Sequence, residues 1–264
     1  MLNIPTKLSG AVTRQTVMSI NQKCIQGPKS LINIKSINNG RNPSASLNTA
    51  SASNHMPVHP QNTGADNSSP AHPIPSKPIP LLKNTVQKGQ KILLANNTAL
   101  SSIQARLGWN VLNSQCDVDV SAFLLNSHGK VLGDDWFVFY GQNTSPDGST
   151  VFSNDTGSDR EMITIHLQKL HPNISKIVFV LTINEAMKKH LNFSMLKDAY
   201  IRILDLSNGS ELVSFKMDEY YSNVTSMMIG EIYRHNGAWK FNAVGNGVAR
   251  DLAGLCELYG VQVV

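Results

Sequence analysis

The chain has 264 residues, of which 41% are hydrophobic, so it is long enough to bury the core of one or two domains. Its three cysteines are too few and too widely spaced for a disulfide framework or a zinc-binding Cys-x-x-Cys pair. No apolar run approaches the ~20 residues of a membrane span. The formal charge of +5 points to anionic partners only if it is spread over the whole chain.

The charge belongs to a predicted basic extension at residues 1–82. Residues 1–85 hold eight lysines and arginines and one acid, whereas residues 86–264 hold fifteen basic and seventeen acidic residues. Residues 36–82 are rich in Ser, Asn and Pro, a composition that buries too little apolar surface to offset the entropy of folding. We therefore expect a disordered extension before a folded domain at 83–264, and no nucleic-acid binding by that mildly acidic domain.

The N-terminal segment also bears on cellular location. Residues 1–23 contain no continuous apolar stretch of the kind that a secretory signal peptide needs. They are basic and free of acids, which leaves import into an organelle as an alternative. Because widely spaced cysteines are usual in a reducing compartment, the sequence predicts a cytoplasmic protein.

From about residue 84 the chain reads as short strands rich in Val, Ile, Phe and Tyr, separated by turn residues. The predicted strands are QKILLA (90–95), CDVDVSAFLL (116–125), DWFVFYG (135–141), STVF (149–152), MITIHL (162–167), KIVFVLTI (176–183), AYIRILDLS (199–207), ELVSFKM (211–217), MMIGEIYRH (227–235) and AWKFNAVG (238–245). The Asn-Gly pairs at 208–209 and 236–237 favour type I′ hairpin turns. The strand at 176–183 is apolar on both faces, which predicts a central position in its sheet.

Two stretches have helical character. NEAMKKHLNF (184–193) is short and amphipathic, and VARDLAGLCELYG (248–260) has apolar residues near the helical period, with Gly260 predicted to end the helix. Many short strands joined by hairpins predict an all-β fold. We expect a two-sheet β-sandwich with a short C-terminal helix.

Oxygen-bearing side chains are concentrated in three places before residue 162. The clusters are Asp117 with Asp119 on one strand, Asp134 with Asp135 at the start of another, and Asn154, Asp155, Asp159 and Glu161 in the hairpin loop FSNDTGSDRE. Only Lys130 and Arg160 are basic between Asp117 and Glu161, so the carboxylates repel one another unless a cation lies among them. Oxygen ligands without His or Cys suit Ca²⁺ or Mg²⁺ rather than zinc. Solvated acidic loops at strand ends explain the same pattern.

Enzymatic alternatives have less support. The sequence has no GxSxG nucleophile elbow, and Cys116 and Cys256 are expected in the core. Two of the clustered carboxylates could serve glycoside hydrolysis, and a metal-dependent phosphatase is another alternative. GNGVARDLAG (245–254) departs from the GxGxxG spacing, so we interpret it as the turn into the last helix.

Longer motifs link these segments. They are LLKNTVQKGQKILL (81–94), LGWNV (107–111), CDVDVSAFLLNSHGKV (116–131), DDWFVFY (134–140), SPDGSTV (145–151), IVFVLTI (177–183), AYIRILD (199–205), GEIYRHNGAWKFNAVGNG (230–247) and LAGLCELYGV (252–261). With these motifs the chain resembles the TerD-type tellurium-resistance and stress-response family over nearly all of its folded part.

The resemblance implies a two-sheet β-sandwich that binds calcium through acidic residues and has no established enzymatic activity. The family's Asp-x-Asp pair corresponds to Asp117 and Asp119, and its acid before FVFY to Asp134 or Asp135. Its acidic loop corresponds to residues 154–161.

The acidic loop departs from the family pattern in two ways. It is shorter here, and Arg160 replaces one of two paired acids, a charge change that weakens cation binding. We therefore expect at least one Ca²⁺ site, and a second that is weaker or absent.

The resulting hypothesis is a non-enzymatic calcium-binding protein of the stress response, associated with tellurite or chemical stress. Its expected partners are calcium ions and proteins of the stress-response system. Two alternatives stay open. One is an interaction scaffold whose basic extension recruits partners. The other is a cyclic-nucleotide-binding module, as described for some relatives with low-complexity extensions, although the sequence contains no evident phosphate-binding loop.

Overall fold

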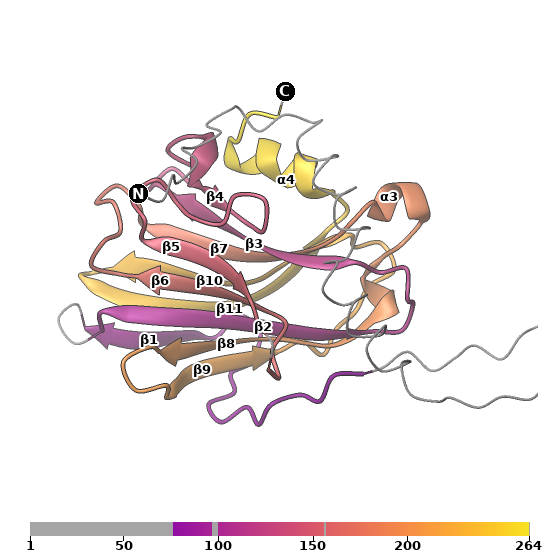
Figure 1. Cartoon of the computed structure of the whole chain (residues 1–264), viewed down its shortest axis with the longest axis horizontal. Coiled ribbons are helices and arrows are strands. Elements are labelled where there is room, and N and C mark those ends of the chain that lie inside the picture. The colour runs from indigo at the N-terminus through magenta and orange to yellow at the C-terminus, as the bar shows by residue number, and fades with distance from the viewer. Residues whose placement is uncertain (1–75, 97–99, 156, 264) are drawn as a thin grey trace, which may run out of the picture. The chain divides into compact units, whose positions relative to one another are not determined.

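Two antiparallel β-sheets make up most of the computed structural model, which describes residues 76–96, 100–155 and 157–263 (Figure 1). The strands are β1 (Lys91–Asn96), β2 (Ser102–Val111), β3 (Val118–Leu125), β4 (Phe137–Val138), β5 (Thr150–Asn154), β6 (Glu161–His166), β7 (Lys176–Ile183), β8 (Leu196–Asp205), β9 (Glu211–Lys216), β10 (Ser226–His235) and β11 (Ala238–Val248). One sheet has the order β1-β11-β10-β7-β3-β4, and the other has the order β5-β6-β2-β8-β9. The predicted β-sandwich is confirmed, whereas the predicted disorder of residues 1–75 lies outside the described residues.

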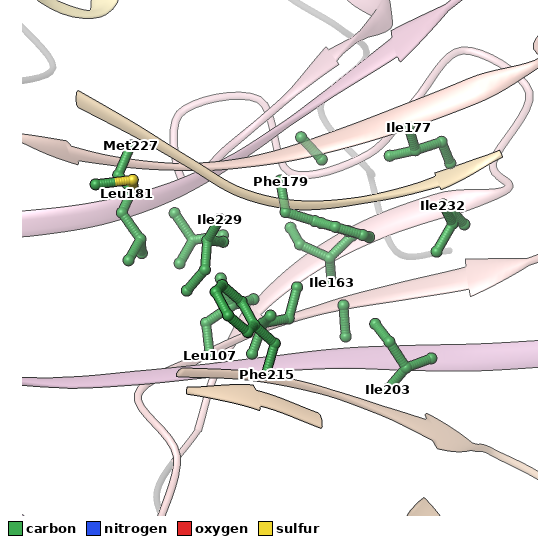
Figure 2. Packing of buried hydrophobic residues seen from close by; sticks show 14 of the residues in the cluster. Leu107, Ile163, Ile177, Phe179, Leu181, Ile203, Phe215, Met227, Ile229 and Ile232 are labelled. Atoms are coloured by element: carbon green, nitrogen blue, oxygen red, sulfur yellow. The ribbon is translucent and has the colours of Figure 1, made fainter. Parts of the chain in front are cut away.

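The two sheets enclose one apolar core (Figure 2). Phe179 and Ile229 from the six-stranded sheet are fully buried, as are Leu107, Ile163 and Ile203 from the five-stranded sheet. In each strand these residues alternate with side chains on the outer face, as a half-buried strand requires. β7 lies between β3 and β10 with seven of its eight residues buried, which confirms its predicted central position.

A second apolar cluster lies on the outer face of the six-stranded sheet, under the helix α4 (Leu252–Tyr259). Leu255 and Cys256 of this helix are fully buried in the cluster. Asp251 caps the helix by accepting a hydrogen bond from Gly254 N, and Gly260 ends it with φ 84°, as predicted. No helix in the described part of the chain is long and apolar enough to cross a membrane.

Some local predictions are wrong. DWFVFYG begins in the 3₁₀ turn η1 (Asp134–Trp136) and contains only the two-residue strand β4. NEAMKKHLNF holds the short helix α3 (Ala186–Lys189) and the first residue of the 3₁₀ turn η2 (Phe193–Met195). The pair at 236–237 has positive φ at both residues, as a type I′ turn needs, whereas at 208–209 only Gly209 does. There the loop is longer, with Gly209 N bonded to Asp205 O.

The sequence analysis also missed β2. Gly108 weakens its strand pattern, but its missing side chain makes room for the buried ring of Tyr200 in β8. A Cβ at Gly108 would lie 2.4 Å from Tyr200 Cζ.

Replacing Gly108 by alanine is therefore expected to lower the free energy of unfolding by about 1–3 kcal/mol, the usual cost of overpacking a core. Urea denaturation measures the change. Gly133→Ala is the control, because the nearest atoms to its Cβ would be the Asp135 carboxylate at 3.3 Å and Trp136 Cδ1 at 3.6 Å. Equal stability of the Gly108→Ala and Gly133→Ala variants would contradict the packing argument.

Residues 76–90, which we call the N-terminal strap, run from one sheet to the other. Thr85 forms a parallel bridge with Ser214 in β9, at the edge of the five-stranded sheet. Gly89 N then donates to Ala243 O in β11 of the six-stranded sheet, just before β1 begins. Residues 76–82, which the sequence analysis assigned to the extension, are thus part of the described structure.

Candidate cation site

Glu161 brings an acidic side chain of one sheet to the backbone of the other. It begins β6 in the five-stranded sheet, yet its Oε2 accepts a hydrogen bond of 2.6 Å from Val120 N in β3. The bond is possible because β4 pairs only with Ala122 and Phe123, which leaves the preceding part of that β3 edge open. The carboxylate of Glu161 therefore lies at an open edge of the sandwich.

Asp117 and Asp119 lie at the same edge. Burial, and next the charge of Asp117, raise the pKa of Asp119 to about 7. Burial also raises the pKa of Glu161 to about 8, with further contributions from Asp119 and Asp117 that outweigh the lowering by Arg160. In the described part of the chain no Lys, Arg or His forms an ion pair with any of these three carboxylates. The edge thus gathers three carboxyl groups that no basic side chain pairs with directly, and burial beside other acids disfavours the charged forms of Asp119 and Glu161.

A cavity of about 350 Å³ opens beside these acids. It is lined by Lys77, Trp109, Val111, Cys116, Asp117, Val118, Asn154, Asp155, Arg160 and Glu161. Asp119 does not line the cavity. Its charge nevertheless interacts with those of Asp117 and Glu161, which do.

The guanidinium of Arg160 contacts Trp109, which also lines the cavity. Its Nε donates to Trp109 O at 2.5 Å, and its guanidinium lies 5.6 Å from the centre of the Trp109 ring. Of the eight residues predicted as ligands, the structure gathers Asp117, Asp119, Asn154, Asp155 and Glu161 at this one edge.

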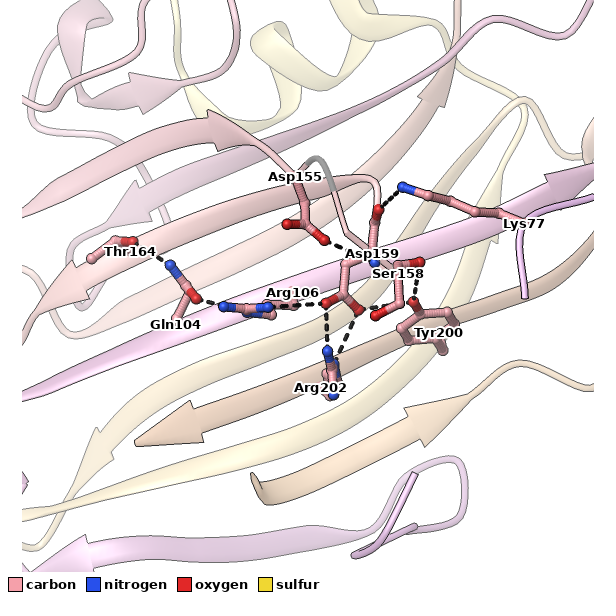
Figure 3. A network of polar contacts seen from close by, with 9 residues as sticks. All are labelled: Lys77, Gln104, Arg106, Asp155, Ser158, Asp159, Thr164, Tyr200 and Arg202. Atoms are coloured by element: carbon pink, nitrogen blue, oxygen red, sulfur yellow. Dashed lines mark hydrogen bonds and ion pairs between the residues drawn. The ribbon is translucent and has the colours of Figure 1, made fainter. Parts of the chain in front are cut away.

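Asp159 lies elsewhere, on the outer face of the five-stranded sheet (Figure 3). Its side chain is fully buried, and its carboxylate accepts hydrogen bonds from Tyr200 Oη at 2.8 Å and Arg202 Nε at 3.0 Å. Arg106 Nη1 lies 3.4 Å from Oδ2. Because these donors already use both carboxylate oxygens, we leave Asp159 out of the ligand set proposed below.

Asp159 also explains an unusual pairing of strands. Arg106 in β2 and Arg202 in β8 are direct register partners, and like charges in that arrangement repel each other. The carboxylate of Asp159 lies between them and offsets one of their two positive charges (Figure 3). Partial burial lowers the pKa of Arg202, but the hydrogen bond and the charge of Asp159 outweigh it and raise that pKa. Burial, and next the charge of Asp159, raise the pKa of Tyr200.

Comparison with known proteins identifies the family of the described domain. Residues 82–259 match the family model of the TerD domain. The chain belongs to the TerD family. The resemblance predicted from its motifs is thereby confirmed, and the folded domain corresponds to the TerD domain.

Curated relatives span the same region. The tellurium resistance protein TerD of Serratia marcescens is 38% identical over 187 residues, covering 67% of this chain and 97% of the relative. General stress protein 16U of Bacillus subtilis is 38% identical over 189 residues, covering 68% of this chain and 98% of the relative. The chemical-damaging agent resistance protein B of Clostridium acetobutylicum is 39% identical over 132 residues, covering 48% of this chain and 95% of the relative.

The two remaining residues predicted as calcium ligands lie away from the cavity. Asp134 and Asp135 belong to η1, and Asp134 Oδ1 accepts a hydrogen bond of 2.7 Å from Gln262 N, near the C-terminus. As the structure stands, no group of three or more His, Cys, Asp or Glu side chains in residues 76–96, 100–155 and 157–263 is arranged to hold a metal ion. A cation at the edge would therefore require some side chains to turn toward it.

Sequence reasoning missed the basic partners of Asp159. Arg106 and Arg202 lie far from Asp159 in the chain, and the strand containing Arg106 was not predicted. One indication was present: Arg202 is the single charge within the apolar stretch YIRIL, and a charge in a strand usually needs a partner. Trp109, which holds Arg160 against the cavity wall, was identified only as part of a family motif.

Proposed function

We propose that this TerD-family protein is a non-enzymatic calcium-binding stress protein. Ca²⁺ would be held by oxygens of Asp117, Asp119, Asn154, Asp155 and Glu161. The observation that carries the proposal is the hydrogen bond from Val120 N to Glu161, which brings a carboxylate of one sheet beside the acids of the other.

The donor set fits a calcium ion. It consists of carboxylates and one amide, without His, which suits a hard cation. Burial of Glu161 and Asp119 near other acids disfavours their charged forms, and a divalent cation would favour those forms. Arg160 lines the same cavity, and its positive charge lowers the pKa of Glu161. A single ion is therefore the stoichiometry we propose.

The cavity offers little support for catalysis. Its lining contains neither Ser nor His. Cys116 lines it, but burial raises the pKa of the thiol, and a protonated thiol is a poor nucleophile. Cys116 and Cys256 are buried free thiols, which favours a reducing location and supports our proposal of a cytoplasmic protein.

Bound calcium would act by joining the two sheets. Ligands from β3, from the β5–β6 loop and from the start of β6 come from both halves of the sandwich. An ion that binds only the folded state stabilises it by about 2.7 kcal/mol at a hundredfold excess over Kd. Stabilisation of this kind suits a role under tellurite or chemical stress, which the names of the relatives suggest. Protein partners of the stress response would then recognise the calcium-loaded form.

Calorimetric titration of the full chain with Ca²⁺, together with its melting temperature, tests this proposal. We expect saturable binding near one ion per chain, a higher melting temperature and weaker binding of Mg²⁺, which tolerates fewer protein ligands. No heat and no shift in melting temperature at millimolar Ca²⁺ would overturn the proposal.

The raised pKa values predict how binding depends on pH. At pH 6 the carboxyls of Asp119 and Glu161, with pKa values of about 7 and about 8, are mostly protonated and must release protons to bind a cation. We expect calcium affinity at least ~10-fold weaker at pH 6 than at pH 8.5. Titrations in matched ionic strength measure it, and an affinity that is equal at both pH values contradicts the ligand set.

The same two groups predict the stability of the calcium-free protein. Because their pKa values are higher in the folded than in the unfolded state, the folded state binds more protons between about pH 4 and pH 8. Their contribution to stability is thus fully present below about pH 4 and is lost as pH rises through 7 to 8. We expect saturating Ca²⁺ to cancel this loss, which urea denaturation at several pH values would measure.

A further inference from the structure

The N-terminal strap is attached to the acidic hairpin loop, residues 155–160, through Lys77. Lys77 Nζ donates a hydrogen bond to the backbone carbonyl of Asp159 (Figure 3). The same lysine lines the candidate cation cavity together with Asp155 and Glu161. A residue from outside the sheets therefore contacts the loop that supplies Asp155 and separates two other proposed ligands, Asn154 and Glu161.

Lys77 is itself fixed on the five-stranded sheet. Its backbone N donates to Asn110 Oδ1 at 2.8 Å, and Asn110 Nδ2 donates to Lys77 O at 3.0 Å. The amide of Asn110 thus bonds both backbone groups of Lys77, much as a neighbouring strand would. Asn110 is buried near the end of β2, so the base of the lysine side chain has a rigid support.

The loop is held from its other side by the network already described. Asp159 is anchored to Arg202 and Tyr200 through its carboxylate, while Lys77 holds its carbonyl. Asp159 N also donates to Asp155 Oδ2 at 2.9 Å. Movement of the Asp159 backbone would therefore reposition Asp155, a proposed ligand.

We propose that Lys77 is a positioning residue for the acidic loop, and that it links the N-terminal extension to the cation site. The effect on the ion rests on the calcium-binding function proposed above. Lys77 lies before residue 82, where the match to the TerD domain begins, so this contact joins the domain to the segment that precedes it. Because linkage is reciprocal, calcium would tighten the attachment of the strap, and release of the strap would weaken calcium binding by the same factor.

Lys77→Ala tests the proposal in the full chain, with Lys83→Ala as the matched control. Lys83 is an exposed strap residue for which only a backbone hydrogen bond, to Glu211, is seen. Hydrogen exchange without calcium reports on the loop directly. Loss of one hydrogen bond is expected to speed exchange at Asp155, Asp159 and Arg160 roughly fivefold to tenfold.

The second measurement is the calcium Kd of each variant. Removing the Lys77 charge from the cavity would by itself strengthen cation binding, so a weaker Kd reports the lost loop contact. Lys77→Ala is expected to weaken binding roughly threefold to tenfold, while Lys83→Ala changes it less than about twofold. Lys77→Arg, which keeps a donor of similar length, is expected to restore most of both effects. A residue that only supports the fold would lower the melting temperature without changing the Kd.

The two measurements separate this proposal from the calcium function. If the native chain binds no calcium but Lys77→Ala speeds loop exchange, Lys77 still positions the loop and its link to an ion is refuted. If calcium binds and Lys77→Ala leaves both loop exchange and Kd unchanged, the positioning role is overturned while the calcium function stands.

Discussion

Replacing Asp159 by alanine is expected to lower the free energy of unfolding by about 3–5 kcal/mol, the usual cost of breaking a buried ion pair. The variant would leave Arg202 and Arg106 facing each other across neighbouring strands with no carboxylate between them. It would also leave the buried hydroxyl of Tyr200 without its hydrogen-bond acceptor at Asp159 Oδ1. Urea denaturation of the full chain at neutral pH measures the loss.

Two variants control for this result. Asp135→Ala removes an exposed carboxylate and is expected to change stability by less than about 0.5 kcal/mol. The double variant Asp159→Ala with Arg202→Met is expected to lose less than the sum of the single changes, because the two side chains interact. Strict additivity would show that the ion pair does not hold the loop.

Replacing Glu161 by glutamine is expected to weaken calcium binding about 30- to 100-fold, since one charged ligand becomes neutral. The amide oxygen can still accept the hydrogen bond from Val120 N, so the variant changes charge with little change in shape. Without calcium the variant is expected to be more stable than the native chain at pH 8, because the repulsion from Asp119 and Asp117 is removed. Titration calorimetry and urea denaturation measure the two effects.

Weaker calcium binding together with higher stability of the calcium-free protein distinguishes a ligand from a structural residue. Glu257→Gln, an exposed change on α4, controls for the loss of one negative charge from the whole protein. A Glu161→Gln variant that is less stable without calcium, or that binds calcium normally, would remove Glu161 from the site.

Most of the fold was predictable from local pattern. β7, β9, β10 and β11 alternate or are continuously apolar over their length, and the turn residues between them have the expected chemistry. β2 was not predictable in this way, because Gly108 and Arg106 have roles that only tertiary partners explain. Gly108 accommodates Tyr200, and Arg106 is paired with Asp159.

The candidate site was predictable only in part. Asp117, Asp119 and Glu161 share one sheet edge because β4 is short, and the length of β4 was overestimated from sequence. Asp159 and Glu161 are two residues apart and looked equivalent, but they point to different places, one between two arginines and the other toward β3. The difference depends on which strands lie beside the loop, which residue spacing does not encode.

The position of β1 has a consequence for how the protein folds. Among the described strands β1 lies at the edge of its sheet and has β11 as its single neighbour, with Lys91 paired to Asn242. β1 cannot pair with β11 until residues 238–248 have left the ribosome, so the six-stranded sheet closes only after those residues are made. Pairing between such distant segments is slow, because the chain must first lose the entropy of a very long loop. Until then β1 and the strap that precedes it remain open to chaperones.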